Sequence, residues 1–227
     1  LVPEGRYTVE VTPRDRAGNV GDTATQAVRA LTSIAAPRAS AELFYGADGD
    51  ALAAVSTQSV KVTHEATITW VIEDETGTVV RHGIVGQVAA AGPLGWDWDG
   101  LDDAGAPVAD GTYTSIVTAT TEVGTYSHEL TIRQMSFDAT GDWQVTARQR
   151  QLLVIESAEP LAGEPTVTVK QPGMDPYVLK VRAQPDGTYT AGWLARPGKA
   201  GKVTITIAGT DTDGGTQSRV YKGRIDR

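Results

Sequence analysis

The sequence predicts an all-β protein: two immunoglobulin-like β-sandwiches in tandem, preceded by the closing hairpin of a third. Thr and Val are abundant and long runs of Leu, Ala, Glu and Lys are absent, a balance that favours strands. One hairpin pattern occurs three times, at a spacing close to the size of a sandwich module. Apolar and polar residues alternate with the period of two that is typical of half-buried strands.

The repeated pattern opens with Gly, has Thr three positions later and closes with a second Gly. Its copies begin at Gly5, Gly111 and Gly201, which are offset by 106 and then 90 residues, and close at Gly18, Gly124 and Gly214. Asp15, Thr121 and Asp211 occupy the equivalent turn position. Each copy predicts a strand, an Asp/Gly-type turn and a returning strand, because Gly permits positive φ in such turns. The return strands are expected at 20–29, 125–133 and 216–225.

These repeats define the expected organisation. Residues 1–31 hold only the closing hairpin of a module, which indicates that the sequence starts inside a module of a longer protein. A middle module is expected over 32–134 and a last one over 135–227, with 32–38 as a short linker that contains Pro37. The second junction, around Gln134, lacks Gly and Pro and predicts a stiff connection.

The middle module carries its own strand pattern. Strands are expected at 39–45, 67–72 and 78–85. In the second of these, Ile68, Trp70 and Ile72 alternate with polar or smaller residues and predict a core face. Trp96 and Trp98 share a face and are expected in the same core.

An ordered set of short motifs in this module resembles a known family. The motifs are Ile72-Glu73-Asp74, Gly77, Val79-Val80-Arg81, Ala91-Gly92, Trp98-Asp99-Gly100, Asp102-Asp103-Ala104-Gly105, Pro107-Val108 and Asp110-Gly111-Thr112-Tyr113-Thr114. Together they resemble the Ig-like repeat named after the C-terminal domain of the flagellar hook-capping protein. The resemblance implies an Ig-like fold and a place in multi-module secreted or cell-surface bacterial proteins. The last module shows only a general Ig-like or fibronectin-like pattern.

Composition excludes several classes of partner. A net charge of −8 disfavours nucleic acid, whose phosphates an acidic chain repels. No run approaches the roughly 20 apolar residues of a membrane helix. The chain has no cysteine, so no disulfide is expected.

Acidic loops suggest a calcium site. Asp48 and Asp50 lie in one Gly-rich loop, and Asp97 and Asp99 in another. Ca²⁺ prefers carboxylate and carbonyl oxygens from such loops. The alternative is that each Asp only stabilises its own turn.

Other chemistry finds less support. His64, His82 and His128 are far apart on different predicted strands, unlike metal-binding histidines. There is no G-x-S-x-G elbow, and the carboxylates lie in turns, so we expect no enzyme activity and no organic cofactor. Trp143 and Trp193 are less constrained by strand pattern and are candidate sugar-stacking residues, with a core role as the alternative.

The leading hypothesis is a non-catalytic structural spacer in an extracellular or cell-envelope protein, with the other modules of the same protein as its partners. The first alternative is an accessory module that binds cell-wall glycan. The second is self-association into a filament by strand complementation through residues 1–31.

Overall fold

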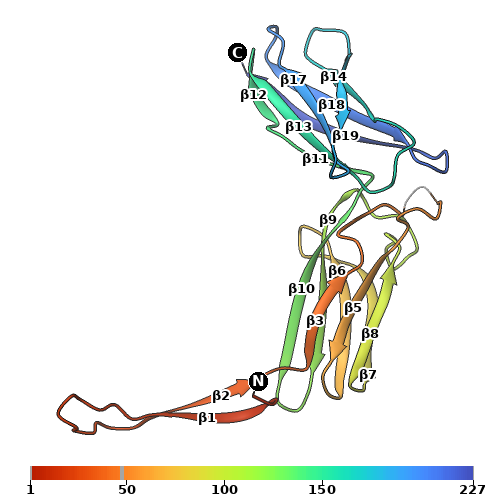
Figure 1. Cartoon of the computed structure of the whole chain (residues 1–227). Coiled ribbons are helices and arrows are strands. Elements are labelled where there is room, and N and C mark those ends of the chain that lie inside the picture. Colours follow the sequence, from red (N-terminus) through yellow and green to blue (C-terminus); the bar gives the residue numbers. More distant parts are fainter. Residues whose placement is uncertain (1, 47–48, 227) are drawn as a thin grey trace. The chain divides into compact units, whose positions relative to one another are not determined.

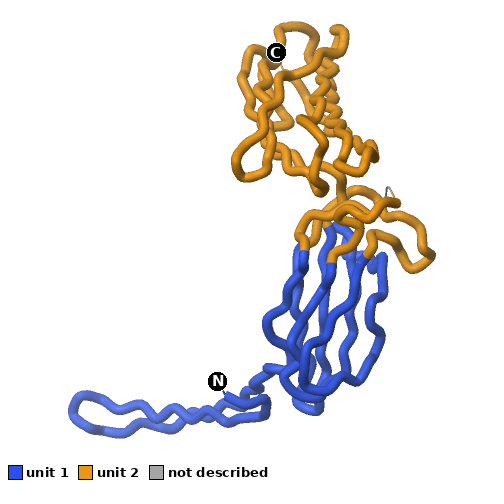
Figure 2. Tube along the Cα trace, turned by 45° about the vertical axis from the view of Figure 1, so that its right-hand side comes forward, with its two compact units in different colours: residues 1–40, 57–98, 113–131 blue, residues 41–56, 99–112, 132–227 orange. Residues whose placement is uncertain are grey.

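The computed structural model describes residues 2–46 and 49–226, which are all strand, turn or loop (Figure 1). The chain divides into two compact units: residues 1–40, 57–98 and 113–131 form one, and residues 41–56, 99–112 and 132–227 form the other (Figure 2). The two loops 41–56 and 99–112 therefore group with the C-terminal part of the chain. Module boundaries at 31/32 and 134/135 stay predictions, because they follow the sequence repeat and not this division.

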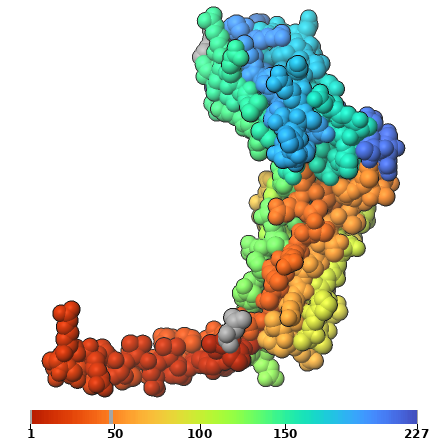
Figure 3. Space-filling view, in the orientation of Figure 1, coloured from red at the N-terminus to blue at the C-terminus, as the bar shows by residue number. Residues whose placement is uncertain are grey.

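The first repeat copy forms a two-stranded antiparallel sheet, β1 (Gly5–Val11) with β2 (Ala24–Ala30). The return strand was expected from residue 20, but the ladder starts only at Ala24. Between the strands the chain makes an isolated bridge from Arg14 to Val20, and Gly21 N donates to Pro13 O. Nearly all residues of both strands are exposed, and in the space-filling view no other segment covers the visible face of the hairpin (Figure 3).

Two sheets form the first sandwich. One has the order β4-β10-β9-β6-β7 and the other β3-β5-β8. The strands are β3 (Ile34–Ala39), β4 (Leu43–Phe44), β5 (Ser56–Val62), β6 (Ala66–Glu73), β7 (Val79–Ala89), β8 (Gly92–Trp98), β9 (Gly111–Thr120) and β10 (Thr125–Gln134). Strands β6, β7 and β10 confirm the runs predicted at 67–72, 78–85 and 125–133.

The expected linker at 32–38 is wrong. Residues 34–39 form strand β3, which pairs antiparallel with β5. Its register shifts between Ala35 and Arg38, where Ala36 has a φ of 49° and Pro37 lacks an N–H to donate. The strand expected at 39–45 is instead interrupted between β3 and β4. Proline here marks a bulge in an edge strand, which a sequence pattern does not separate from a linker.

The core of this sandwich draws from both of its sheets. Trp70 and Trp98 are fully buried, as predicted, and Trp96 is half-buried and packs edge-on to Trp70 with ring centroids 6.5 Å apart. The Trp70 indole N–H donates to Ser115 Oγ at 2.7 Å, so the polar edge of the ring keeps a partner inside the core. A Cβ at Gly83 would lie 2.3 Å from the Trp96 ring, so strand β7 needs glycine at this position.

The second sandwich has sheets ordered β11-β13-β17-β16 and β12-β19-β18-β14-β15. Its strands are β11 (Phe137–Thr140), β12 (Gln144–Thr146), β13 (Arg150–Ser157), β14 (Thr166–Lys170), β15 (Tyr177–Leu179), β16 (Val181–Ala183), β17 (Tyr189–Leu194), β18 (Gly201–Thr210) and β19 (Thr216–Asp226). Strand β19 confirms the return strand expected at 216–225. One apolar cluster fills the space between the sheets and includes Phe137, Leu153, Ile155, Ile205 and Ile207.

Candidate metal centre

Four turns share one hydrogen-bonding scheme built on an aspartate. Three are hairpin turns, and the fourth lies in the loop between β8 and β9. The Oδ1 atoms of Asp15, Asp74, Asp102 and Asp211 each accept from the backbone N–H groups two and four residues later, at 2.8–3.0 Å. A glycine three residues after the aspartate has positive φ, for example 81° at Gly77 and 91° at Gly214. This is the turn chemistry predicted for the repeat, and it accounts for one oxygen of each carboxylate.

Asp211 differs from the other turn aspartates in its surroundings. It is 1% exposed, whereas Asp15 is exposed and Asp74 is only half-buried. While Oδ1 holds the turn between β18 and β19, the buried Oδ2 has no hydrogen-bond partner. A carboxylate oxygen buried in this way is costly unless a positive group faces it.

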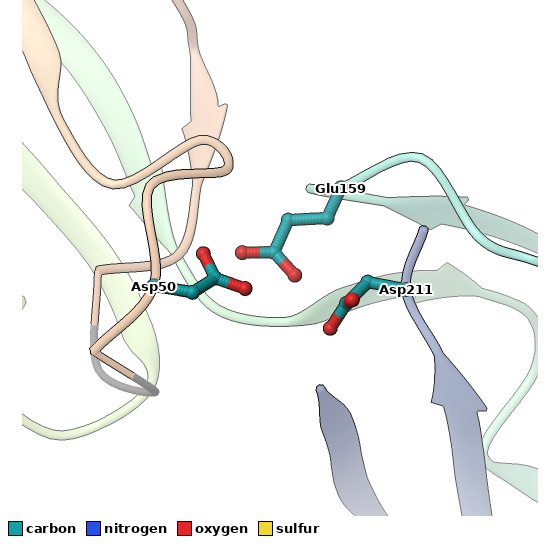
Figure 4. A group of neighbouring side chains, drawn as sticks. All are labelled: Asp50, Glu159 and Asp211. Carbon is teal, nitrogen blue, oxygen red and sulfur yellow. The ribbon is translucent and has the colours of Figure 1, made fainter. Parts of the chain in front are cut away.

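Two further carboxylates meet Asp211 within the same compact unit (Figure 4). Glu159 comes from the loop between β13 and β14 and is 2% exposed, and Asp50 comes from the loop between β4 and β5 and is half-buried. One oxygen from each of the three lies within 4.8 Å of the others. At this separation two charged carboxylates repel by roughly 3 kcal/mol with an effective dielectric constant of 20.

Local contacts place each of these side chains. Asp50 Oδ1 accepts from Leu52 N at 2.7 Å, and Tyr45 N donates to Ala53 O, which closes the loop that carries Asp50. Glu159 is followed by Pro160, whose carbonyl accepts from Thr212 N in the Asp211 turn at 3.1 Å. Glu159 Oε2 also accepts from Gln217 Nε2 on β19.

The residues predicted as calcium ligands do not all lie together. Asp50 joins Glu159 and Asp211, while Asp48 lies outside the described residues. Asp97 is exposed on β8, and half-buried Asp99 accepts from Leu101 N at 3.1 Å. Among the described residues, the acidic group that can share a cation contains neither of these two, nor any histidine.

Sequence reasoning missed Glu159 and treated Asp211 only as a turn residue. The repeat marked Asp211 correctly as a turn former. Nothing in the sequence around it shows that Asp211 is buried whereas Asp15 is exposed. Glu159 has no motif around it, and it reaches Asp211 only because the β13–β14 loop runs beside the β18–β19 turn.

The two tryptophans proposed for sugar contact are packed against their own sandwich. Trp193 is 1% exposed, and its indole N–H donates to Tyr177 Oη at 2.9 Å. Tyr177 Oη in turn donates to the buried Gln171, and the Arg196 guanidinium lies 3.6 Å from the Tyr177 ring centroid. Half-buried Trp143 stacks on Tyr221 with ring centroids 4.7 Å apart. Sugar stacking by either ring stays a prediction, and binding of the protein to a glycan array would test it.

A second polar cluster lies at the base of the β1–β2 hairpin. The Glu4 side chain is 6% exposed, and its Oε2 accepts from Ser33 Oγ at 2.5 Å and from Thr32 N at 3.1 Å. Oε1 accepts from Thr121 Oγ1, and His64 Nε2 lies 2.9 Å from Oε2. Burial alone would raise the pKa of Glu4, but these hydrogen bonds and the charge of His64 together lower it to about 2.

The acidic residue just before the second repeat makes a related contact. Asp110 precedes Gly111 as Glu4 precedes Gly5, and its Oδ2 lies 3.9 Å from Arg219 Nε on β19. Burial raises the pKa of Asp110, and the Arg219 charge offsets part of that effect. In both cases the acid before one repeat contacts the closing hairpin of the next.

Fold and sites together define the class: the chain is an all-β protein of immunoglobulin-like sandwiches. Residues 46–122 match the family model described as the FlgD Ig-like domain, which confirms the resemblance seen in the middle module. Comparison with curated proteins gives no match. Among solved structures 49 chains match. One of them, described as titin Ig tandem domains, is 14% identical and has a TM-score of 0.27, with 86% of this chain and 99% of that chain covered. In the described part of the chain, no helix is long and apolar enough to cross a membrane.

Proposed function

We propose that the chain is a non-catalytic spacer region of a multi-module protein exported to the surface or envelope of a bacterium. It holds the domains next to it at a set separation, and its partners are the other modules of the same protein. The match of residues 46–122 to an Ig-like domain family supports a structural module. The family resemblance supports the exported location.

One observation carries this proposal: the acidic residues before the first two repeats, Glu4 and Asp110, each contact the closing hairpin of the next repeat. Glu4 is bound by Thr121 and Ser33, and Asp110 faces Arg219. A flexible tether needs no such contacts, because Gly- and Ser-rich chains provide reach without them. A spacer of defined length does need them, since its joints must resist bending.

Spin-label distance measurements test the joint at Glu4. The chain has no cysteine, so cysteines introduced at exposed Arg16 and Lys61 carry the only labels. We expect a narrow distance distribution that broadens in Glu4→Ala and stays narrow in the control Glu10→Gln, an exposed position on β1. A broad distribution in the doubly labelled parent chain would contradict the spacer function.

The non-catalytic part has its own test. Purified chain is incubated with peptidoglycan and with soluble polysaccharides, and released fragments are measured by mass spectrometry. We expect no release above the level of a heat-denatured sample. Turnover that persists through repeated purification would overturn this part of the proposal.

The exposed face of the first hairpin favours a second candidate, self-association by strand addition. Tyr7, Val9 and Val11 alternate along β1 and therefore share one face, where Val28 lies opposite Tyr7. These four side chains are 37–59% exposed, on a two-stranded sheet with open edges. Sedimentation velocity over a concentration series tests it: Val9→Lys should abolish any dimer, and a chain that stays monomeric at every concentration would exclude it.

A further inference from the structure

We propose that Asp50, Glu159, Asp211 and Gln217 form a calcium-binding site. The site goes beyond the spacer role and does not rest on it. Three of its residues are acids that come from three separate loops, and the fourth is a neutral amide on strand β19.

The amide is evidence independent of the acidic group. Gln217 is 3% exposed, and its Nε2 donates to Glu159, which places the carboxamide at the cluster. The Oε1 atom of the same carboxamide is buried and has no hydrogen-bond partner. A buried amide oxygen beside carboxylates needs a positive partner, and a cation is one.

Asp211 also has a buried oxygen without a hydrogen-bond partner. Its Oδ2 is buried without a hydrogen-bond partner, and the hydrogen bonds from Asp213 N and Gly215 N both go to Oδ1. A Cβ at residue 215 would lie 2.2 Å from Oδ2, so Gly215 leaves the space that this oxygen occupies. The turn therefore holds Asp211 with Oδ1 engaged in hydrogen bonds and Oδ2 buried without one.

Geometry and ligand type point to calcium. Two ligands of one Ca²⁺ at 2.3–2.6 Å are at most about 5 Å apart, and the three carboxylate oxygens lie within 4.8 Å of one another. All four donor groups offer oxygen, whereas zinc sites use mostly His and Cys. Calcium takes six to eight oxygens, so four protein groups leave positions for water. Magnesium, which requires a tighter octahedron and keeps more water, fits a carboxylate-rich buried site less well.

Calcium binding would have a structural result. The loop that carries Asp50 is closed by its own local hydrogen bonds. An ion shared with Glu159 and Asp211 joins this loop to two loops of the second sandwich, all within one compact unit. Binding should therefore protect residues 49–55 from proteolysis and hydrogen exchange.

Calorimetry and thermal melting of the full chain test the site. After EDTA treatment and desalting, CaCl₂ is titrated into the protein. We expect a Kd between about 10⁻⁴ and 10⁻³ M, the range of extracellular calcium modules. At 10 mM CaCl₂ the Tm should rise by about 5 °C over the value in EDTA.

Matched variants locate the binding. Asp211→Asn keeps the Oδ1 acceptor that holds the turn, and Glu159→Gln keeps the shape of its side chain. Each should weaken calcium binding at least tenfold. Asp74→Asn is the control, because Asp74 holds the same kind of turn in a different hairpin and should leave the Kd unchanged.

Two outcomes would overturn the proposal. The first is a wild-type chain that gives neither heat nor a Tm shift with CaCl₂. The second is calcium binding that both folded variants retain, which would place the binding elsewhere. If a variant does not fold, terbium luminescence tests the site instead. The wild-type chain is then compared with Asp50→Asn, which changes the half-buried ligand.

Discussion

The Thr121 hydroxyl donates a hydrogen bond to the carboxylate of Glu4, 117 residues earlier in the chain. Thr121 occupies the position in its repeat that Asp15 and Asp211 occupy in theirs. An aspartate there would face Glu4 with a like charge, whereas threonine offers a donor. Threonine in the middle repeat, where the other repeats have aspartate, is therefore compatible with the Glu4 carboxylate beside it.

Removing the Glu4 carboxylate should loosen the hairpin base. Glu4→Ala leaves the buried hydroxyl of Ser33 without its acceptor, at a cost of about 1–3 kcal/mol in the free energy of unfolding of this region. Hydrogen exchange of β1 and β2, followed by mass spectrometry, measures the effect. Glu10→Gln provides the comparison, and equal exchange in all three proteins would show that Glu4 does not anchor the hairpin.

The same carboxylate gives a pH dependence. The pKa of Glu4 lies at about 2 in the folded chain against 4.5 in an unfolded one, so folding favours the charged form. Its contribution to stability is complete above pH 4.5 and is lost as the pH falls through about 2. Carbon-13 NMR of the side-chain carboxyl measures the pKa directly, and Thr121→Val should raise it. A Glu4 pKa near 4.5 in the wild-type chain would contradict this assignment.

Within the first sandwich, Ser115→Ala should destabilise the core. Ser115 is 1% exposed and accepts from the Trp70 indole, which would then be buried without an acceptor. We expect a loss of about 1–3 kcal/mol in denaturant unfolding followed by tryptophan fluorescence. Ser127→Ala removes an exposed hydroxyl that contacts Thr118 and should change stability by less than about 0.5 kcal/mol. Equal effects of the two substitutions would show that the indole contact adds nothing.

In the second sandwich, Tyr177→Phe removes one hydroxyl that serves two buried partners. The Trp193 indole loses its acceptor, and Gln171 loses a donor. The expected loss is about 1–3 kcal/mol in guanidinium unfolding, against little change for Tyr126→Phe at an exposed position. Retained stability in Tyr177→Phe would mean that water replaces the hydroxyl.

The sequence predicted what depends on local pattern. Alternation placed Ile68, Trp70 and Ile72 in the core, and the repeat placed three hairpins with their Asp or Thr turns. It failed at Pro37, because a bulged edge strand and a linker both tolerate proline. It found Asp50 but neither Glu159 nor Gln217, because the cluster forms only when three loops and a strand distant in the chain meet. Burial of Asp211 is likewise a tertiary property, and no motif records it.

The shared aspartate turn has a consequence for the order of folding. Each hairpin can close through contacts between residues no more than about 25 apart, which form in microseconds, whereas the sheets of a sandwich need partners far along the chain. We expect the carboxylate at each hairpin turn to fix the strand register before those distant partners arrive. We therefore expect Asp74→Asn and Asp74→Ala to differ in folding rate more than in unfolding rate, which stopped-flow measurements of both limbs would determine.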